Sequence, residues 1–311
     1  METLILKGNE QQAIPCVATI GMFDGVHKGH RFVLSHICDY AKAHQLASMV
    51  ITFDQHPREV VQTDWKPQLL TTFDERMRLL AETGIDYCVV LPFTKEMAAL
   101  TAHDFMQLMA NQLGVKVLMT GYDNRFGHNR YDTFEDYVRY GKEIGVTVES
   151  LPPAPIKGTG SMISSSLIRR LLSAGNVKEA AKCLTYPYHI TGKVVKGEHI
   201  GTTLGFPTAN LQLNDPRKLI PASGVYAVRC LVEEGRRMMF VGMMNIGTRP
   251  TFGEHSQTLE VHILDYEGDL YGQEITVSFI ERLREERHFD NEEELKAQLK
   301  EDANTVHSLK L

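Results

Sequence analysis

The sequence lacks a long hydrophobic run, clustered cysteines and an excess of basic residues. No stretch approaches the roughly 18 consecutive apolar residues of a membrane span. The N-terminus, METLILKGNEQQ, has an acidic Glu2 and no basic start before an apolar core, so no secretory signal is indicated. The five cysteines are scattered and never spaced as Cys-x-x-Cys, which argues against a disulfide framework and a zinc site. These absences predict a cytoplasmic protein.

The chain is mildly acidic, with 33 Lys and Arg against 39 Asp and Glu and a net charge of −6. Without a basic run it is a poor candidate for a general nucleic-acid binder. The sequence also lacks internal repeats, low-complexity tracts and a Walker A motif. A chain of 311 residues with 43% hydrophobic and 23% charged residues is typical of a globular protein with two domains.

Short apolar runs alternate with helix-like segments through the first half of the chain. The expected strands are 16–21, 48–53, 87–93, 115–121 and 146–151, and the expected helices lie near 30–45, 74–83, 103–113 and 133–144. Asp74 is the expected N-cap of the second of these helices. Buried strands separated by amphipathic helices predict an α/β domain with a Rossmann-like parallel sheet and helices on both faces.

The pattern changes after a Pro- and Gly-rich stretch at 152–160. Two short helices are expected next, and the boundary between domains is expected near Pro187. The predicted domains are therefore 1–186 and 187–311.

From His189 onward the chain is rich in short apolar strands with Gly-rich and acidic turns. This pattern predicts an all-β barrel or sandwich. The last 20 residues are amphipathic and are expected to form a terminal helix, with Asp290 and Glu293 as its capping box.

The segment Gly21–His30, GMFDGVHKGH, follows an expected strand and opens a helix. Ligands of open parallel sheets bind at the carboxyl ends of strands. Gly25 and Gly29 permit close approach of a phosphate, the helix start offers free N–H groups, and His27 and His30 add donors. Nucleotidyl transfer needs such fixed donors around the α-phosphate. From local chemistry alone, a metal site or a structural role for the histidine pair stays open.

A second segment of the first half starts a helix with three hydroxyls, Ser164–Ser166, followed by Arg169. Hydroxyls and an arginine at a helix N-terminus form an anion site suited to a β,γ-phosphate tail. The ordinary alternative is serine capping of a surface helix.

The second half has a glycine-rich segment with Gly197, Gly201 and Gly205 at four-residue spacing. Such a loop suits a phosphate tail, although plain turns in a β domain show the same composition. Thr208 and Asn210 place two oxygen ligands on one side of an extended chain. Neutral hard oxygens suit Mg²⁺ already bridged by ATP phosphates.

These motifs resemble those of the bacterial bifunctional riboflavin kinase/FAD synthetases. The Gly-x-Phe-Asp-Gly-x-His-x-Gly-His and Ile-Ser-Ser-Ser-x-Ile-Arg stretches are similar to the N-terminal module of that family, which belongs to the His-x-Gly-His nucleotidylyltransferases. Thr52–Arg58 and Gly121–Gly127 are similar to two further segments of the module. Gln55 stands where the family usually has proline, and Asn124 where it usually has phenylalanine.

The second half resembles the riboflavin kinase domain of the same family. The segments that match it in order and approximate spacing are Leu204–Asn210, Gly224–Tyr226, Asn245–Thr251 and Glu260–His262, with a looser match at Arg282–Phe289. The resemblance covers roughly residues 14–311.

The resemblance implies riboflavin kinase activity in the second domain and FMN adenylyltransferase activity in the first. Glu260 would be the general base that takes the proton of the ribityl hydroxyl, and His27 and His30 would hold the ATP phosphates. The substrates would be riboflavin, FMN and ATP, with Mg²⁺, and no nucleic acid or membrane partner is expected. The other expected site residues are Gly21, Phe23, Asp24, Gly25, Gly29, Ser164, Ser165, Arg169, Gly197, Gly201, Gly205 and Thr208 for ATP; Asp123, Asn124, Phe126, Phe206 and Pro207 for flavin; and Thr208 and Asn210 for the metal.

Two alternatives remain. The first is a nucleotidylyltransferase for another small acceptor with a passive β domain. The second is a non-catalytic flavin-binding protein that keeps the fold.

Overall fold

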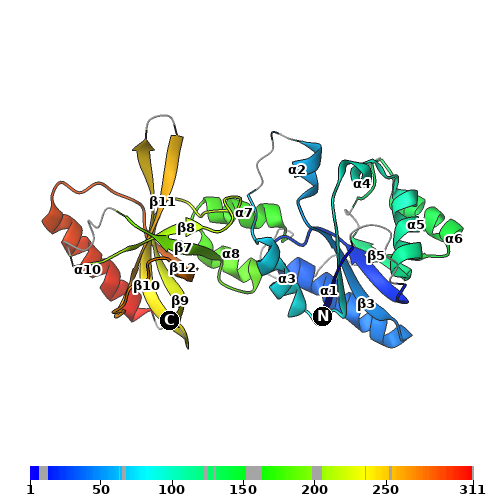
Figure 1. The fold of residues 1–311 in the computed structure, drawn as a ribbon, viewed down its shortest axis with the longest axis horizontal. Coiled ribbons are helices and arrows are strands. Elements are labelled where there is room, and N and C mark those ends of the chain that lie inside the picture. The colour runs from blue at the N-terminus through cyan, green and yellow to red at the C-terminus, as the bar shows by residue number, and fades with distance from the viewer. Residues whose placement is uncertain are drawn as a thin grey trace. The chain divides into compact units, whose positions relative to one another are not determined.

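The computed structural model describes residues 1–6, 13–62, 64, 68–121, 125–128, 131–151, 163–197, 205–234, 236–251 and 254–309. The chain divides into two compact units, Met1–Ser165 and Ser166–Leu311, whose elements are labelled in Figure 1. Helix α8 and all but the first residue of α7 belong to the second unit, and the predicted boundary near residue 186 stays a prediction.

The first unit is built on a six-stranded sheet in which every pairing is parallel. Its strands are β1 (Glu2–Ile5), β2 (Cys16–Ile20), β3 (Ala47–Phe53), β4 (Tyr87–Leu91), β5 (Val115–Gly121) and β6 (Thr147–Leu151). Almost every residue of β2, β3 and β4 is buried, as expected for strands covered on both faces. The predicted α/β class is confirmed.

The helices of this unit are α1 (Lys28–His44), α2 (Pro57–Val61), α3 (Phe73–Ala81), α4 (Lys95–Ala99), α5 (Ala102–Leu113) and α6 (Phe134–Ile144). A threonine caps the N-terminus of four of them by accepting from a backbone N–H of the first turn: Thr72, Thr94, Thr101 and Thr133. The prediction that Asp74 caps α3 is wrong, because Thr72 holds that position.

The strand order β1-β4-β3-β2-β5-β6 places β2 in the middle of the sheet. From β2 the chain first builds β3 and β4 on one side and then returns to build β5 and β6 on the other. The strand order therefore reverses between β2 and β5, and ligands of open α/β sheets bind outside the carboxyl ends at that point.

The second unit begins at the second residue of α7 (Ser165–Ser173), continues with α8 (Val177–Leu184) and contains a closed barrel. The barrel strands are β7 (His189–Val195), β8 (Ala209–Leu213), β9 (Gly224–Glu234), β10 (Arg236–Thr251), β11 (Glu254–Ile263) and β12 (Glu274–Arg284), in the order β10-β11-β8-β7-β12-β9. Of the two predicted architectures, barrel and sandwich, the barrel is the one observed.

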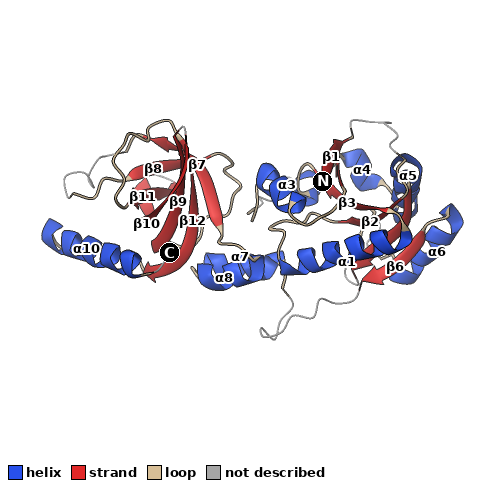
Figure 2. Cartoon of the chain, turned by 90° about the horizontal axis from the view of Figure 1, so that it is seen from below, coloured by secondary structure: helices blue, strands red, loops and turns tan. Residues whose placement is uncertain are grey.

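Helix α10 (Glu292–Ser308) packs on β10, and Figure 2 shows it in blue beside the red barrel strands. Val306 of the helix belongs to an apolar cluster with Val225 and Met243 of the barrel. Asn291 caps the helix, with Glu294 as its partner, so the predicted Asp290–Glu293 box is wrong by one residue. In the part of the chain that the structure describes, no helix is long and apolar enough to cross a membrane.

Candidate active sites

The loop after β2 is fixed by the carboxylate of Asp24. One oxygen accepts from the backbone N–H and the hydroxyl of Thr71, both at 2.9 Å, and the other accepts from Leu70 N at 3.0 Å. The same hydroxyl accepts from the backbone N–H of Gly25 at 3.0 Å. Because Asp24 is buried, these bonds fasten the loop to the segment before α3.

Three residues of this loop have a left-handed backbone: Phe23 (φ 52°), Gly25 (φ 84°) and Val26 (φ 35°). A positive φ is tolerated by glycine but is costly for a β-branched residue such as Val26. Strained backbone of this kind persists only where the surroundings hold it in place, and it is common at ligand-binding sites.

His27 and His30 lie together at the start of α1. The ring centroids are 3.7 Å apart and the rings are nearly parallel, at 16°. His27 is the N-cap of α1, and its Nδ1 accepts from His30 N at 3.4 Å. Burial, with a smaller contribution from the charge of His27, lowers the pKa of His30 well below its ordinary value of 6.5. The ring of His30 is therefore neutral at physiological pH, and it can offer hydrogen bonds but no charge.

The hydroxyl-rich segment predicted to join this site does lie beside it. The Ser165 hydroxyl donates to the carbonyl oxygen of Asp24 at 2.9 Å. A Cβ added at Gly29 would stand 3.5 Å from the carbonyl oxygen of Ile163. Two segments separated by more than 130 residues thus meet at the start of α1.

A cavity of about 200 Å³ opens at the carboxyl ends of the central strands. Its walls are largely apolar and include Gly21 after β2, Phe53 at the end of β3, Phe93 after β4 and Phe126 after β5. Phe126 is held by a stacked contact with Tyr137, with centroids 4.4 Å apart. Its apolar and aromatic lining is typical of sites that bind small organic molecules.

Arg76 of α3 braces two of the strand ends that line this cavity. It is buried and donates through its guanidinium to the carbonyl oxygen of Met22, at 3.1 Å, and to that of Phe53. Burial is the main cause that lowers the pKa of Arg76, and the charge of Asp24 acts in the opposite direction.

In the second unit, a cavity of about 310 Å³ lies between the barrel and α10. Phe206, Met243 and Leu299 contribute apolar wall, while Glu260 and Thr208 contribute polar groups. The charged residues that also line it are Arg284, Glu286 and Arg287.

Arg284 is oriented by α10. Its guanidinium donates to the buried carboxylate of Asp302, at 3.0 Å from Nε and 2.8 Å from the terminal nitrogen. Gln298 also donates to Asp302, at 2.9 Å. The pair fixes a cation at the edge of the cavity.

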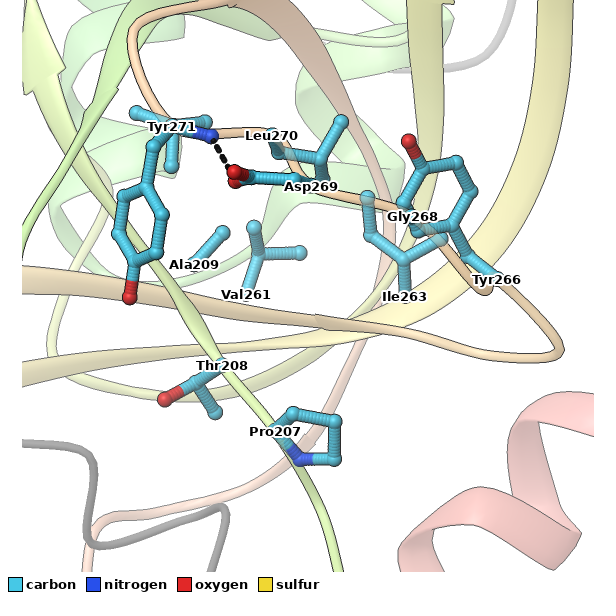
Figure 3. A pocket seen from close by; sticks show the side chains of 11 residues that line it. Pro207, Thr208, Ala209, Val261, Ile263, Tyr266, Gly268, Asp269, Leu270 and Tyr271 are labelled. Carbon is cyan, nitrogen blue, oxygen red and sulfur yellow. Dashed lines mark hydrogen bonds between the residues drawn. The ribbon is translucent and has the colours of Figure 1, made fainter.

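A smaller cavity of about 160 Å³ adjoins the same strand end, and Figure 3 shows the side chains that line it. Pro207 and Thr208 form one wall, and the Tyr266–Tyr271 turn forms another. The turn is held by the carboxylate of Asp269, which accepts from Tyr271 N at 2.9 Å. Thr208 lines both this cavity and the larger one.

Asn210 stands next to Glu260 across the β8–β11 ladder, where the two residues are partners. A Cβ at Gly197 would overlap the side-chain amide of Asn210. The absence of a side chain at Gly197 therefore leaves the room that Asn210 occupies.

Family comparisons agree with the geometry of both units. The FAD synthetase family model matches residues 9–167, and the riboflavin kinase family model matches residues 184–310. The bifunctional riboflavin kinase/FMN adenylyltransferase of Escherichia coli (strain K12) is 41% identical over 292 residues, covering 94% of this chain and 91% of that protein. The chain belongs to this bifunctional family. The namesake of Haemophilus influenzae is 35% identical, with coverage of 94% and 93%.

A solved structure supports the same architecture. A crystal structure described as a macrolide-efflux protein from Streptococcus pneumoniae has a TM-score of 0.88 and 31% identity, and the match covers 99% of both chains. The macrolide-efflux description applies to the Streptococcus protein and is not carried over to this chain.

Membership confirms the predicted family and enzyme class, and it does not favour the two alternatives. As a kinase and adenylyltransferase, the enzyme uses ATP and takes flavins as substrates. The roles of individual residues stay predictions. Asp123, Asn124 and Gly201 lie outside the described residues.

The remaining predicted residues fall into three places. Gly21, Phe23, Asp24, Gly25, His27, Gly29, His30, Ser164 and Ser165 lie at or beside the start of α1 and the end of β2, and Phe126 lies across the cavity there. Arg169 lies one turn into α7. Glu260, Phe206, Pro207, Thr208, Asn210, Gly197 and Gly205 lie at or near the two barrel cavities and β8.

Sequence reasoning missed the residues that fix the sites from outside, namely Arg76, Thr71 and Asp302. The signal that could have pointed to Arg76 is its place on the face of the expected helix that packs on the sheet. A charged residue is rarely buried there unless it has a specific partner. Gln55, which departs from the family pattern, donates to the carbonyl oxygen of Phe93 at 3.0 Å and so joins the ends of β3 and β4.

Proposed function

We propose that the two units act in succession. The barrel unit transfers the γ-phosphoryl group of ATP to riboflavin, giving FMN and ADP. The first unit then transfers AMP from a second ATP to FMN, giving FAD and pyrophosphate. The five cysteines are free, which suits a reducing compartment, and we place the enzyme in the cytoplasm.

The observation that carries the kinase proposal is the position of Thr208 in the walls of both barrel cavities. The larger cavity, with Phe206 and Met243, suits the flavin ring. The smaller one, beside the Tyr266–Tyr271 turn, suits the nucleotide. A substrate in each would bring the terminal phosphate and the ribityl hydroxyl together near Thr208.

Glu260 is the proposed base of this step. Its carboxylate takes the proton of the terminal ribityl hydroxyl as that oxygen bonds to the γ-phosphorus, and the bond to the β,γ-bridging oxygen breaks to release ADP. Glu260 lines the larger cavity together with Thr208, which supports its assignment as the base on the acceptor side.

Thr208 and Asn210 are the proposed ligands of Mg²⁺. They are two residues apart along extended chain, so both side chains share one face, and both offer neutral oxygens. The room left for Asn210 by Gly197 supports this assignment. When bound, Mg²⁺ would neutralise charge on the β- and γ-phosphates.

In the first unit, the phosphate of FMN is itself the nucleophile and needs no base, because it is ionised at neutral pH. His27, His30 and the N-terminus of α1 would hold the ATP phosphates while charge develops on the α-phosphate. Ser164, Ser165 and Arg169, which match the family's Ile-Ser-Ser-Ser-x-Ile-Arg stretch, would hold the leaving pyrophosphate. The aromatic cavity after β2 would take the flavin ring.

The test is a single incubation with riboflavin, excess ATP and Mg²⁺, with flavins separated by chromatography over time. FMN should form first and then convert to FAD, and EDTA should stop FMN formation. FMN that accumulates without FAD would contradict the adenylyltransferase assignment. Unchanged riboflavin would contradict the kinase assignment.

A further inference from the structure

The segment Phe206–Thr208 lines both cavities proposed for the kinase substrates, yet it lies just outside the barrel ladder. Strand β8 begins at Ala209, and its pairing with β11 joins Ala209 to Val261 and Asn210 to Glu260. Continued by one residue, the ladder would bring Thr208 opposite His262. The observed pairs stop before that point, so backbone pairing with β11 does not hold this segment.

Beyond the end of the ladder, the side chain of His262 holds the segment by a hydrogen bond. His262 Nδ1 lies 2.7 Å from the carbonyl oxygen of Pro207. A carbonyl oxygen only accepts, so Nδ1 carries the hydrogen and the ring donates. Pro207 has no N–H to offer a ladder. Among the residues that the structure describes, this is the hydrogen bond that holds Pro207.

The ring of His262 also contacts the neighbouring residue. Its centroid lies 5.3 Å from that of Phe206, in an edge-to-face arrangement at 68°. Glu260 and His262 are two residues apart on β11, so they face the same side, and both line the 310 Å³ cavity. His262 thus links the strand that carries Glu260 to the segment that carries Thr208.

We propose that His262 is a positioning residue for riboflavin phosphorylation, whose Nδ1–H holds Pro207 and thereby sets Thr208 in register with Glu260. This inference rests on the proposed kinase function. It assigns no proton transfer to His262. A displacement of about 1 Å between reacting groups is enough to slow an enzyme about 100-fold.

The test compares H262N, H262Q and H262A in the full chain. The amide nitrogen of Asn can stand near the position of Nδ1, whereas that of Gln reaches toward the position of Nε2. H262A and H262Q should lower the kcat of FMN formation about 100-fold, with a much smaller change in the KM for riboflavin. H262N should retain most of the wild-type kcat. FAD formation from supplied FMN should be unchanged in all three and serves as the internal control.

Three results would overturn the proposal: H262N as slow as H262Q, a wild-type kcat in H262A, or a raised KM with unchanged kcat. The last would make His262 a support of Phe206 for binding alone. The comparison of Asn with Gln keeps its force if H262A does not fold, because both variants carry an amide. A wild-type enzyme that forms no FMN would instead overturn the proposed function itself.

Discussion

The absence of a side chain at Gly29 leaves space for the ring of His27. A Cβ at this position would stand 3.2 Å from both Cε1 and Nδ1 of that ring, which is already stacked on His30. Alanine is favoured over glycine inside a helix by about 1 kcal/mol. Gly29→Ala should therefore change the stability of the first unit by no more than about 1 kcal/mol, yet lower the rate of FAD formation from FMN at least about 10-fold.

The rate of FAD formation and the thermal unfolding temperature measure these two effects separately. Ser35→Ala, at an exposed position of the same helix, is the matched control and should change neither. A Gly29→Ala enzyme with full activity would show that the His27 ring is free to move.

The lowered pKa of His30 makes stability depend on pH. Between the folded pKa and the ordinary 6.5, the unfolded chain binds more protons than the folded one. The stability of the first unit is therefore fully present above about pH 6.5 and falls as the pH drops below it, by at most about 1.4 kcal/mol per pH unit.

Calorimetry at about pH 7.5 and about pH 5.5 would measure this loss, and His30→Gln should reduce it. The same loss in wild type and variant would assign the pH dependence to other groups.

At the scale of elements, α3 braces the sheet through Arg76. Arg76→Met removes the donors to the carbonyl oxygens of Met22, two residues after β2, and of Phe53, the last residue of β3. The first unit should lose about 1–3 kcal/mol of stability, and FAD formation from FMN should slow while FMN formation persists. Urea unfolding and the two separate assays measure these outcomes. Loss of FMN formation alone would contradict the role given to Arg76.

Most helices and strands could be predicted because the apolar pattern that indicates each of them lies within its own segment of sequence. Strands β3 and β5 are mostly apolar, and β10 has an apolar middle from Met238 to Met244, so each carries its own signal. Strands β1 and β8 were missed. β1 is a four-residue edge strand, and β8, Ala-Asn-Leu-Gln-Leu, is short and half polar. Both are strands because of their neighbours, through pairing that no local pattern encodes.

The predicted N-caps of α3 and α10 lie within one or two residues of their observed positions. Asp74 lies in the first turn of α3 where an acidic residue favours the dipole, but Thr72 lies at the position whose hydroxyl reaches Glu75 N. Thr72 and Glu75 form the capping box of α3. The predicted cap of α3 is two residues too late, because the sequence pattern does not set the exact first residue of a helix.

At the scale of the whole molecule, the family could be predicted because its motifs are local in sequence and come in order through both units. The positions of the cavities could not be predicted from the sequence. The wall of the first-unit cavity comes from the ends of four strands, and the 310 Å³ cavity needs α10 laid on the barrel. Such walls depend on tertiary packing. For the same reason the sequence did not predict that Arg76 and Asp302 support the sites.

The two proposed reactions are chemically separate, with His27 and His30 serving one and Glu260 the other. The most direct test is to give His30→Ala and Glu260→Ala the same mixture of riboflavin, ATP and Mg²⁺, and each of them FMN and ATP in parallel. His30→Ala should form FMN at nearly the wild-type rate and no FAD. Glu260→Ala should lose FMN formation by about 100-fold or more and still convert supplied FMN to FAD. Equal loss of both activities in either folded variant would contradict the account.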